Sequence, residues 1–306
     1  MIIYIDENDE NIRLDNYVSG MFIDISRSKI QKFIKEGQVL VNGVIKKPAY
    51  SLKIGDKLEF DKLENEELKI LPQNIPLDIV YEDDNMLVVN KPSGMLTHPT
   101  SSELENTLVN ALLYKYGENL SDLNGEFRRG IIHRLDRNTS GLLMVAKNNN
   151  AHEFLANQIR ERSITKKYHA IIKGNYNGDE DRIDLPIGRH PKAPHKMAVV
   201  PVKDGGKESV TVLKVLERFK EATYVDLTLI TGRTHQIRVH MSYMHHPVYN
   251  DTLYGSGVGR VKTEEQVLQS YYLCFTKPVT NEIIELEIEP DEKLSKVLNF
   301  YRNRRN

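Results

Sequence analysis

The stretch from Leu58 to Asn85, LEFDKLENEELKILPQNIPLDIVYEDDN, constrains the fold most, because it divides the chain. It carries an acidic patch followed by prolines that interrupt regular structure: Glu64, Glu66, Glu67, Pro72 and Pro76. A chain of 306 residues is also longer than one domain usually is. We therefore expect a boundary between about residues 61 and 76, with domains at 1–65 and 76–306 and a linker at 66–75.

The segment before this boundary predicts a small unit with one helix and one hairpin. The helix is expected between a capping serine, Ser26, and a terminating glycine, Gly37. Its apolar residues fall on one face at helical spacing: Ile30, Phe33 and Ile34. The sequence QVLVNGVIKK then predicts a β-hairpin that turns at Asn42–Gly43.

This unit is basic, although the whole chain has a formal net charge of only -1. Residues 27–53 contain one acidic residue, Glu36, and seven basic ones: Arg27, Lys29, Lys32, Lys35, Lys46, Lys47 and Lys53. Such a cluster suits a nucleic-acid backbone. The alternative is an ordinary solvated helix face, and composition alone leaves both open.

The segment after the boundary predicts an α+β fold. Apolar runs typical of strands occur at 77–82, 85–91, 141–146, 166–174, 223–231 and 283–290. Helical patterns occur at 104–117, 150–163 and 234–244. Because the strands outnumber the helices and do not alternate with them, a mixed sheet is expected rather than a doubly wound parallel one.

A dense polar cluster precedes the expected strand at 141–146. In GIIHRLDRNTSGLLMVAKN, residues 130–148, one carboxylate, Asp136, is flanked by Arg134 and Arg137. A carboxylate beside guanidinium groups suits a nucleophile or a base. The alternative is a turn residue that binds its own backbone.

A second cluster, TGRTHQIRVHM, offers Arg233 and Arg238. The helix expected there places Arg238 and Thr234 on one face. Arg238 could therefore fix Asp136 through a bidentate pair from a distant segment. A plain interdomain salt bridge is the alternative.

Several classes of site are not indicated by the sequence. It lacks a phosphate-binding loop of the Walker type and a His-Glu-x-x-His helix. The single cysteine, Cys274, cannot form an internal disulfide or a cysteine zinc cluster. The N-terminus does not resemble a signal peptide, and no apolar run reaches the ~20 residues of a spanning helix. We expect a cytoplasmic protein with no metal.

The stretch HRLDRNTSGLL, residues 133–143, resembles the signature of the RluA/RluD family of RNA pseudouridine synthases. IPLDIVYEDDNMLVVNKPSGMLTHP is similar to the family's opening strands, RSITKKYHAIIKG to its tyrosine motif, and LITGRTHQIRVHMSYMHHPVYNDTLYG to its arginine motif. The N-terminal unit resembles an S4 RNA-binding domain, so the resemblance covers nearly the whole chain. Two departures are Asn250–Asp251 in place of Gly-Asp, and YLCF at 272–275; both are expected at packing or loop positions.

The resemblance implies an enzyme that breaks the N1–C1′ bond of uridine, turns the uracil and rejoins it through C5. It implies catalytic roles for Asp136, Tyr168 and Arg238, and roles in RNA contact or base flipping for Arg134, His133, Asn138, Thr139 and Ile237. The S4-like unit would bind RNA through Arg27, Lys29, Lys32, Lys35, Lys46 and Lys47. It further implies a monomer without a cofactor that acts on 23S ribosomal RNA or on precursors of the large subunit.

Two other functions fit parts of the sequence. One is an S4-type assembly factor with an inactive catalytic domain, against which the presence of Asp136, Tyr168 and Arg238 argues. The other is a small-molecule hydrolase that uses Asp136 with His133, which leaves the basic N-terminal unit unexplained. Release of tritium from uracil C5 distinguishes all three, because only isomerisation replaces that hydrogen.

Overall fold

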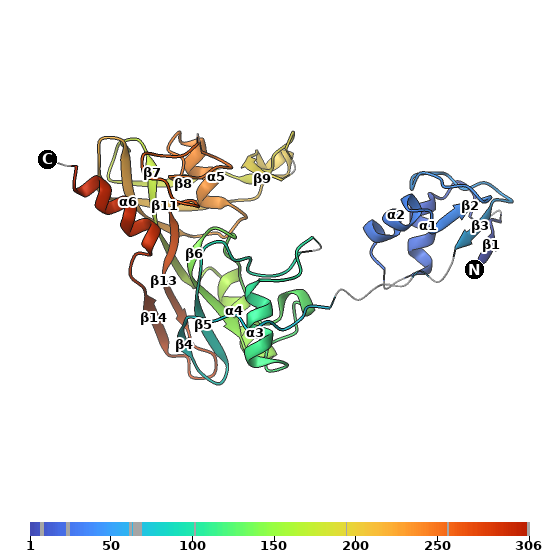
Figure 1. The fold of residues 1–306 in the computed structure, drawn as a ribbon, viewed down its shortest axis with the longest axis horizontal. Coiled ribbons are helices and arrows are strands. Elements are labelled where there is room, and N and C mark those ends of the chain that lie inside the picture. The colour runs from blue at the N-terminus through green and yellow to red at the C-terminus, as the bar shows by residue number, and fades with distance from the viewer. Residues whose placement is uncertain are drawn as a thin grey trace. The chain divides into compact units, whose positions relative to one another are not determined.

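The computed structural model describes residues 1–6, 9–22, 25–60, 63, 69–100, 102–193, 195–255 and 257–304. Within it the chain forms two compact units, residues 1–68 and 69–306, each with its own core (Figure 1). The acidic patch at Glu64, Glu66 and Glu67, and the start of the expected linker, lie outside the described residues. In the described part of the chain, no helix combines the length and the apolar character needed to cross a membrane.

The first unit packs two helices against a small antiparallel sheet. The helices are α1 (Leu14–Met21) and α2 (Arg27–Lys35), and the strands lie in the order β1 (Ile2–Tyr4), β3 (Lys57–Phe60), β2 (Val39–Val41). The backbone N–H of Lys29 donates to the Ser26 hydroxyl, and Gly37 follows the helix with φ +79°. The expected helix is therefore confirmed, and its apolar face is buried in the core of this unit.

The expected hairpin at Asn42–Gly43 is only half right. Both residues have positive φ, 55° and 73°, as a tight two-residue turn requires. Only Val44 bridges back to Val41, however, and the partner of β2 is β3. Leu58 and Phe60 of β3 are buried, whereas Val44 and Ile45 are exposed, so β3 brings apolar side chains to the core and residues 44–47 do not.

The second unit is built on a nine-stranded sheet, in which the order β4-β5-β6-β13-β7-β12-β11-β8 is extended by β14 on β13. The strands are β4 (Ile79–Glu82), β5 (Met86–Lys91), β6 (Ser140–Ala146), β7 (Thr165–Lys173), β8 (Glu180–Asp184), β11 (Val210–Arg218), β12 (Ala222–Leu229), β13 (Leu268–Thr276) and β14 (Ile283–Glu287). A separate pair is formed by β9 (Ile187–Arg189) and β10 (Met197–Val199). The pairing of β13 with β6 is parallel and the other registers are antiparallel, which confirms the mixed, mainly antiparallel sheet.

Helices cover both faces of this sheet: α3 (Leu108–Tyr116), α4 (Asn149–Arg160), α5 (Gln236–Tyr243) and α6 (Glu292–Arg302). Short 3₁₀ turns are η1 (Glu126–Arg128) and η2 (Val202–Asp204). Leu143 and Val145 of β6 share a core with α3 and α5, and the alternate Leu142 and Met144 share a core with α4. Every residue of β6 is buried, which explains why its sequence is continuously apolar rather than alternating.

Candidate active site

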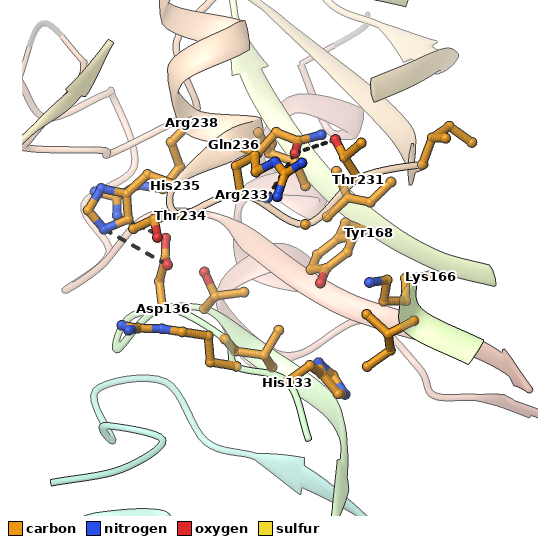
Figure 2. Close-up of a pocket in the computed structure, with 18 of the residues that line it drawn as sticks. His133, Asp136, Lys166, Tyr168, Thr231, Arg233, Thr234, His235, Gln236 and Arg238 are labelled. Atoms are coloured by element: carbon orange, nitrogen blue, oxygen red, sulfur yellow. Dashed lines mark hydrogen bonds and ion pairs between the residues drawn. The ribbon is translucent and has the colours of Figure 1, made fainter. Parts of the chain in front are cut away.

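Three segments far apart in the sequence line a cavity of about 480 Å³ on the second unit (Figure 2). The first is the loop before β6, which carries Asp136, and the second is the strand β7, which carries Tyr168. The third is the segment from Leu229 into the first turn of α5, which carries Arg238. The cavity thus brings together the three residues singled out as catalytic. It also includes most of the other residues expected to contact RNA: His133, Arg134, Thr139 and Ile237.

One buried lysine and one half-buried lysine hold the loop that carries Asp136. Lys91 is fully buried, and its ammonium donates to the carbonyl oxygens of Pro92, Met95 and Arg137 at 2.7, 2.8 and 3.0 Å. Lys293 of α6 donates to the carbonyl oxygen of Asn138 at 3.2 Å. The backbone on the C-terminal side of Asp136 is therefore held by strong hydrogen bonds from charged donors.

The flanking arginines do not pair with Asp136, although they stand beside it in the sequence. Arg137 forms an ion pair with Glu103, and Arg134 is exposed to solvent. The contact instead comes from Arg238, whose Nη1 donates to Asp136 Oδ2 at 3.1 Å. Both residues belong to the second unit, so this ion pair is not an interdomain bridge.

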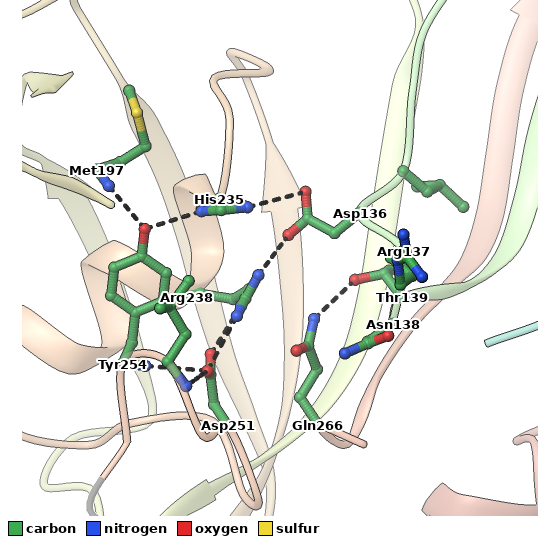
Figure 3. A network of polar contacts seen from close by, with 12 residues as sticks. Asp136, Arg137, Asn138, Thr139, Met197, His235, Arg238, Asp251, Tyr254 and Gln266 are labelled. Atoms are coloured by element: carbon green, nitrogen blue, oxygen red, sulfur yellow. Dashed lines mark hydrogen bonds and ion pairs between the residues drawn. The ribbon is translucent and has the colours of Figure 1, made fainter. Parts of the chain in front are cut away.

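The bidentate pair expected between Arg238 and Asp136 is made with Asp251 instead (Figure 3). Arg238 Nε and Nη2 donate to the two carboxylate oxygens of Asp251 at 2.7 and 3.0 Å, which leaves Nη1 for Asp136. Burial by itself would raise the pKa of Asp251, but Arg238 and the backbone N–H groups of Leu253 and Tyr254 together lower it. Asp251 therefore orients the guanidinium, in addition to the packing or loop position expected from the sequence.

A histidine faces the other oxygen of Asp136. His235 Nε2 lies 3.9 Å from Asp136 Oδ1, and His235 Nδ1 lies 2.8 Å from the hydroxyl of Tyr254. The Tyr254 hydroxyl accepts a hydrogen bond from the backbone N–H of Met197 at 2.8 Å. This bond favours an orientation in which the hydroxyl proton points to His235 Nδ1. Burial lowers the pKa of His235, against the opposing charge of Asp136. The arrangement describes a neutral imidazole that presents its Nε2–H toward the carboxylate.

His235 also explains why α5 begins later than expected. Its φ is +57°, so the helix starts only at Gln236 and Thr234 precedes it. The side chain of Gln236 holds this turn, because its Oε1 accepts the Arg233 N–H and the Thr231 hydroxyl. Thr234 and Arg238 line the same cavity without sharing a helix face.

Tyr168 lies on β7 and its ring is 6% exposed. Burial raises the pKa of its hydroxyl, and the charge of Asp136 adds to this effect while Ser270 opposes it. The hydroxyl therefore stays protonated at neutral pH. Ile237, 4% exposed, supplies an apolar side chain to the same cavity.

His133 is engaged with the backbone. Its Nε2 accepts the N–H of Met144 in β6 at 3.0 Å. Burial lowers the pKa of His133 to about 3. A neutral histidine whose acceptor nitrogen is occupied is poorly suited to remove a proton beside Asp136, which weakens the hydrolase alternative.

Asn138 and Thr139 support the loop. The carbonyl oxygen of Asn138 accepts from Ser93 and Lys293, and this residue does not belong to the cavity lining. Thr139 is buried at the edge of the cavity, and its hydroxyl accepts a hydrogen bond from Gln266 at 3.2 Å.

The cavity lining is strongly basic. Asp136 is the single carboxylate among the lining residues, whereas six carry cationic side chains: Arg134, Arg160, Arg162, Lys166, Arg233 and Arg238. This distribution suits a polyanionic substrate. In the described part of the chain, no group of three or more His, Cys, Asp or Glu side chains is placed to hold a metal ion.

The basic residues of the first unit differ in whether their side chains contact other residues of the unit. Arg27 donates to the buried Asp15 at 3.1 Å. Lys29 and Lys46 lie over the rings of Phe33 and Tyr50, and Lys32 lies 3.7 Å from Glu36. Of the six residues expected to bind RNA, four are exposed: Arg27, Lys32, Lys35 and Lys47.

Three residues of the site were missed by sequence reasoning: His235, Asp251 and Tyr254. His235 and Arg238 stand in the same short motif, and Asp251 and Tyr254 follow within 16 residues of Arg238. Their closeness to Arg238 in the sequence, together with their polar or ionisable side chains, was the available signal. What the sequence could not show is that their side chains converge on Asp136.

Comparisons with known proteins agree with this geometry. Residues 85–243 match the family described as RNA pseudouridylate synthase, and residues 12–58 match the S4 domain.

Curated relatives match nearly end to end. The uncharacterized RNA pseudouridine synthase YlyB of Bacillus subtilis is 42% identical, over 97% of this chain and 96% of its own. The ribosomal large subunit pseudouridine synthase D of Vibrio parahaemolyticus is 40% identical, over 92% of this chain and 89% of its own. Among solved structures, human RNA pseudouridylate synthase domain containing 1 has a TM-score of 0.58 and 27% identity, covering 78% of this chain and 98% of that one.

Proposed function

The chain belongs to the RNA pseudouridylate synthase family, and on that premise we propose that it isomerises specific uridines of 23S ribosomal RNA with Asp136 and without a cofactor. One observation supports the role of Asp136 above all. It is the only carboxylate among the cavity-lining residues, and Arg238 and His235 face it from two sides. The S4 domain and the name of the Vibrio relative support a large-subunit RNA as the substrate.

Asp136 acts at C1′ of the target ribose in this proposal. Its carboxylate either adds to C1′ as uracil departs or promotes formation of a glycal, and both routes detach the base. The hydrogen bond from Arg238 occupies Oδ2, so Oδ1 is the oxygen left to react, with the imidazole of His235 beyond it. A carboxylate held in this way needs little reorganisation during the reaction.

Tyr168 supports the target base in this proposal. Its ring lies in the cavity, where an aromatic face can stack on uracil with a gain of roughly 1–3 kcal/mol. Burial raises the pKa of the Tyr168 hydroxyl, so this proposal assigns stacking of the base to its ring and leaves removal of the C5 proton unassigned. The hydroxyl can still exchange hydrogen bonds with the turning ring.

The target uridine must leave its helix to reach this cavity. Flipping costs a few kcal/mol, and the exposed guanidinium of Arg134 at the cavity can fill the vacated stack. Thr139 and Ile237 shape the pocket, and Asn138 and His133 hold its loop through backbone contacts.

RNA affinity is assigned to the S4 domain. The proposed division is residues 1–65 for RNA binding, 66–75 as linker and 76–306 for catalysis. Lys32, Lys35 and Lys47 expose their charges, so they are the candidates for phosphate contact in the first unit.

The proposal is tested by tritium release from an unmodified 23S RNA transcript labelled at uracil C5. The wild-type protein should release tritium, and the label should fall in parallel with the appearance of pseudouridine. Tight RNA binding without any release would support the inactive assembly factor instead. Pseudouridine mapping in cells that lack the protein then identifies the target uridines.

A further inference from the structure

Lys166 is a buried cation in the cavity that has no partner within the described part of the chain. It stands two residues before Tyr168 on β7, so both side chains leave the same face of the strand. Its side chain lines the cavity and the residue is 9% exposed. Its ammonium lies over Gly232 at the cavity, and among the residues that the structure describes none forms a hydrogen bond or ion pair with it.

This isolation distinguishes Lys166 from three arginines of the cavity wall, Arg160, Arg162 and Arg233. Arg162 pairs with Glu208, Arg233 donates to the Glu208 carbonyl oxygen, and Arg160 donates to Asn157. Burial lowers the pKa of Lys166, and no carboxylate opposes that effect. A buried charge without a partner destabilises a fold, so its presence beside the candidate active site points to use by a ligand.

The position of Lys166 relative to Asp136 suggests which part of the ligand it meets. Figure 2 shows Asp136 and Lys166 on opposite sides of Tyr168. If uracil stacks on Tyr168 with its sugar at Asp136, the distal edge of the ring faces Lys166. In uridine the group across the ring from N1 is the C4 carbonyl.

The same position is occupied by a carbonyl after the ring has turned. When C5 takes the place of N1 beside the sugar, the group across the ring becomes the C2 carbonyl. A donor at the distal edge therefore meets an oxygen in both orientations without moving. Cytosine would present its amino group there in the first orientation, and that group cannot accept a hydrogen bond.

We propose that Lys166 is a further catalytic residue, which donates to the uracil carbonyl oxygen across the ring and stabilises the uracil anion. The inference rests on the proposed function. When the C1′–N1 bond breaks, its electron pair stays on the base and spreads onto O2 and O4. C5 then bonds to C1′, the C5 proton leaves to a base, and N1 takes up a proton, so the step needs no oxidant or reductant.

The test compares Lys166→Met with Lys167→Met. Lys167 follows on the opposite face of β7, where its ammonium lies over the ring of Tyr272, so it serves as the matched control. Lys166→Met should lower kcat for tritium release by roughly 100-fold, as loss of one charge-stabilising donor does, and change KM little. Its thermal midpoint should hold or rise, because a buried unpaired charge is removed. Lys167→Met should keep wild-type kcat.

A second comparison identifies the atom that Lys166 meets. The target uridine is replaced by 4-thiouridine in one RNA, and its 5′ phosphate by a methylphosphonate in another. The ratio of the wild-type rate to the Lys166→Met rate should become smaller on the RNA with 4-thiouridine, because sulfur is a weaker acceptor than oxygen. The same ratio should stay unchanged on the RNA with the methylphosphonate. A ratio that shrinks only on the methylphosphonate would show that Lys166 binds phosphate, and would overturn the inference.

Two failures remain distinguishable. If the wild-type protein releases no tritium from any RNA, the proposed function falls and the inference falls with it. If the wild-type protein is active and Lys166→Met matches it in kcat, the function stands and only the role of Lys166 is lost.

Discussion

The tripeptide Arg-Leu-Asp occurs in both units, and its two aspartates have different surroundings. In the first unit, Arg13 folds back and donates to both oxygens of Asp15 at 3.0 Å. Arg27 and Gln31 add further bonds to the same carboxylate, which is fully buried. In the second unit, Arg134 turns to solvent, and Asp136 receives a single bond from Arg238, 102 residues further along the chain.

The difference teaches that arginines near an aspartate in sequence do not identify a reactive carboxylate. Asp15 has its lone pairs filled, as befits a structural residue in the first turn of α1. Asp136 keeps 16% of its side chain exposed and has an oxygen without a short contact among the described residues. The proposed catalytic role of Asp136 therefore rests on its remaining acceptor capacity beside a cavity, and not on the arginines near it in the sequence.

The largest expected effect comes from Asp136→Asn. The amide has nearly the same shape but cannot act as nucleophile or base, so kcat for tritium release should fall at least about 1,000-fold. RNA affinity, measured by filter binding, should stay within about threefold of wild type. Full turnover by this variant would end the catalytic assignment.

Asp251→Asn should come next, with a loss of about 100-fold in kcat. The change removes the charge that orients Arg238, and a mispositioned guanidinium no longer holds Asp136. Steady-state kinetics should show the loss in kcat rather than in KM. An equal rise in KM without loss of kcat would assign Asp251 to RNA binding.

Asp15→Asn should affect stability and spare chemistry. Loss of the charged acceptor should lower the free energy of unfolding of the first unit by about 1–3 kcal/mol, measured by urea titration of the full chain. Tritium release at saturating RNA should be unchanged. A large fall in kcat with unaltered unfolding would erase the contrast between the two aspartates.

Asp15 should also make the first unit acid-sensitive. The hydrogen bond from Arg13 is the main cause that lowers the pKa of Asp15, against burial. A group whose folded-state pKa is lowered stabilises the fold above its ordinary value of 3.8, and that contribution is lost as the pH falls further. In Asp15→Asn this part of the pH dependence below about pH 4 should disappear.

Tyr254→Phe should have a smaller effect, about tenfold in kcat. The ring that covers Arg238 at 5.0 Å is kept, while the hydroxyl that contacts His235 is lost. Without the hydrogen bond from Tyr254, the neutral form of His235 is less stabilised, so His235 can change tautomer and its pKa can rise. The acidic limb of the pH profile of kcat should therefore move to higher pH. An unchanged profile would remove the histidine from the site.

The smallest effect should come from Lys35→Ala in the first unit. Lys35 is exposed, so losing one phosphate contact should flatten the salt dependence of RNA binding by a slope of roughly 0.7–0.9. Unfolding should not change, unlike in a variant of Arg27, which also holds Asp15. An unaltered slope would mean that Lys35 is only solvated.

Local patterns predicted much of the fold. The expected strand at 141–146 and helix at 150–163 correspond to β6 and α4 within a few residues, because strong apolar patterning and caps coincide there. The final helix α6 was missed, although Asp291 caps it and Leu294, Val297, Leu298 and Tyr301 are buried at helical spacing. The hairpin failed for another reason: the turn is local, but the partner of β2 is chosen by core burial.

The site was predictable only in part. Asp136, Tyr168 and Arg238 could be selected from motifs, and the structure brings them to one cavity. The hydrogen bonds among these residues could not be predicted from motifs. Arg238 divides its donors between Asp136 and Asp251, and only the three-dimensional positions of the two carboxylates decide how. Likewise, Lys166 looks like any strand lysine until its burial without a partner is known.

The hydrogen bonds of Lys293 affect the order in which parts of the protein can fold during translation. This lysine in α6 reaches Ser93 at 2.8 Å and the carbonyl oxygen of Asn138, 155 residues earlier in the chain. During translation, the loop of Asp136 emerges long before the residue that secures it. The S4 domain, in contrast, has its core residues within the first 63 positions and can fold while the rest is still being made. The S4 domain of a nascent chain can thus be folded well before the loop of Asp136 is held in place.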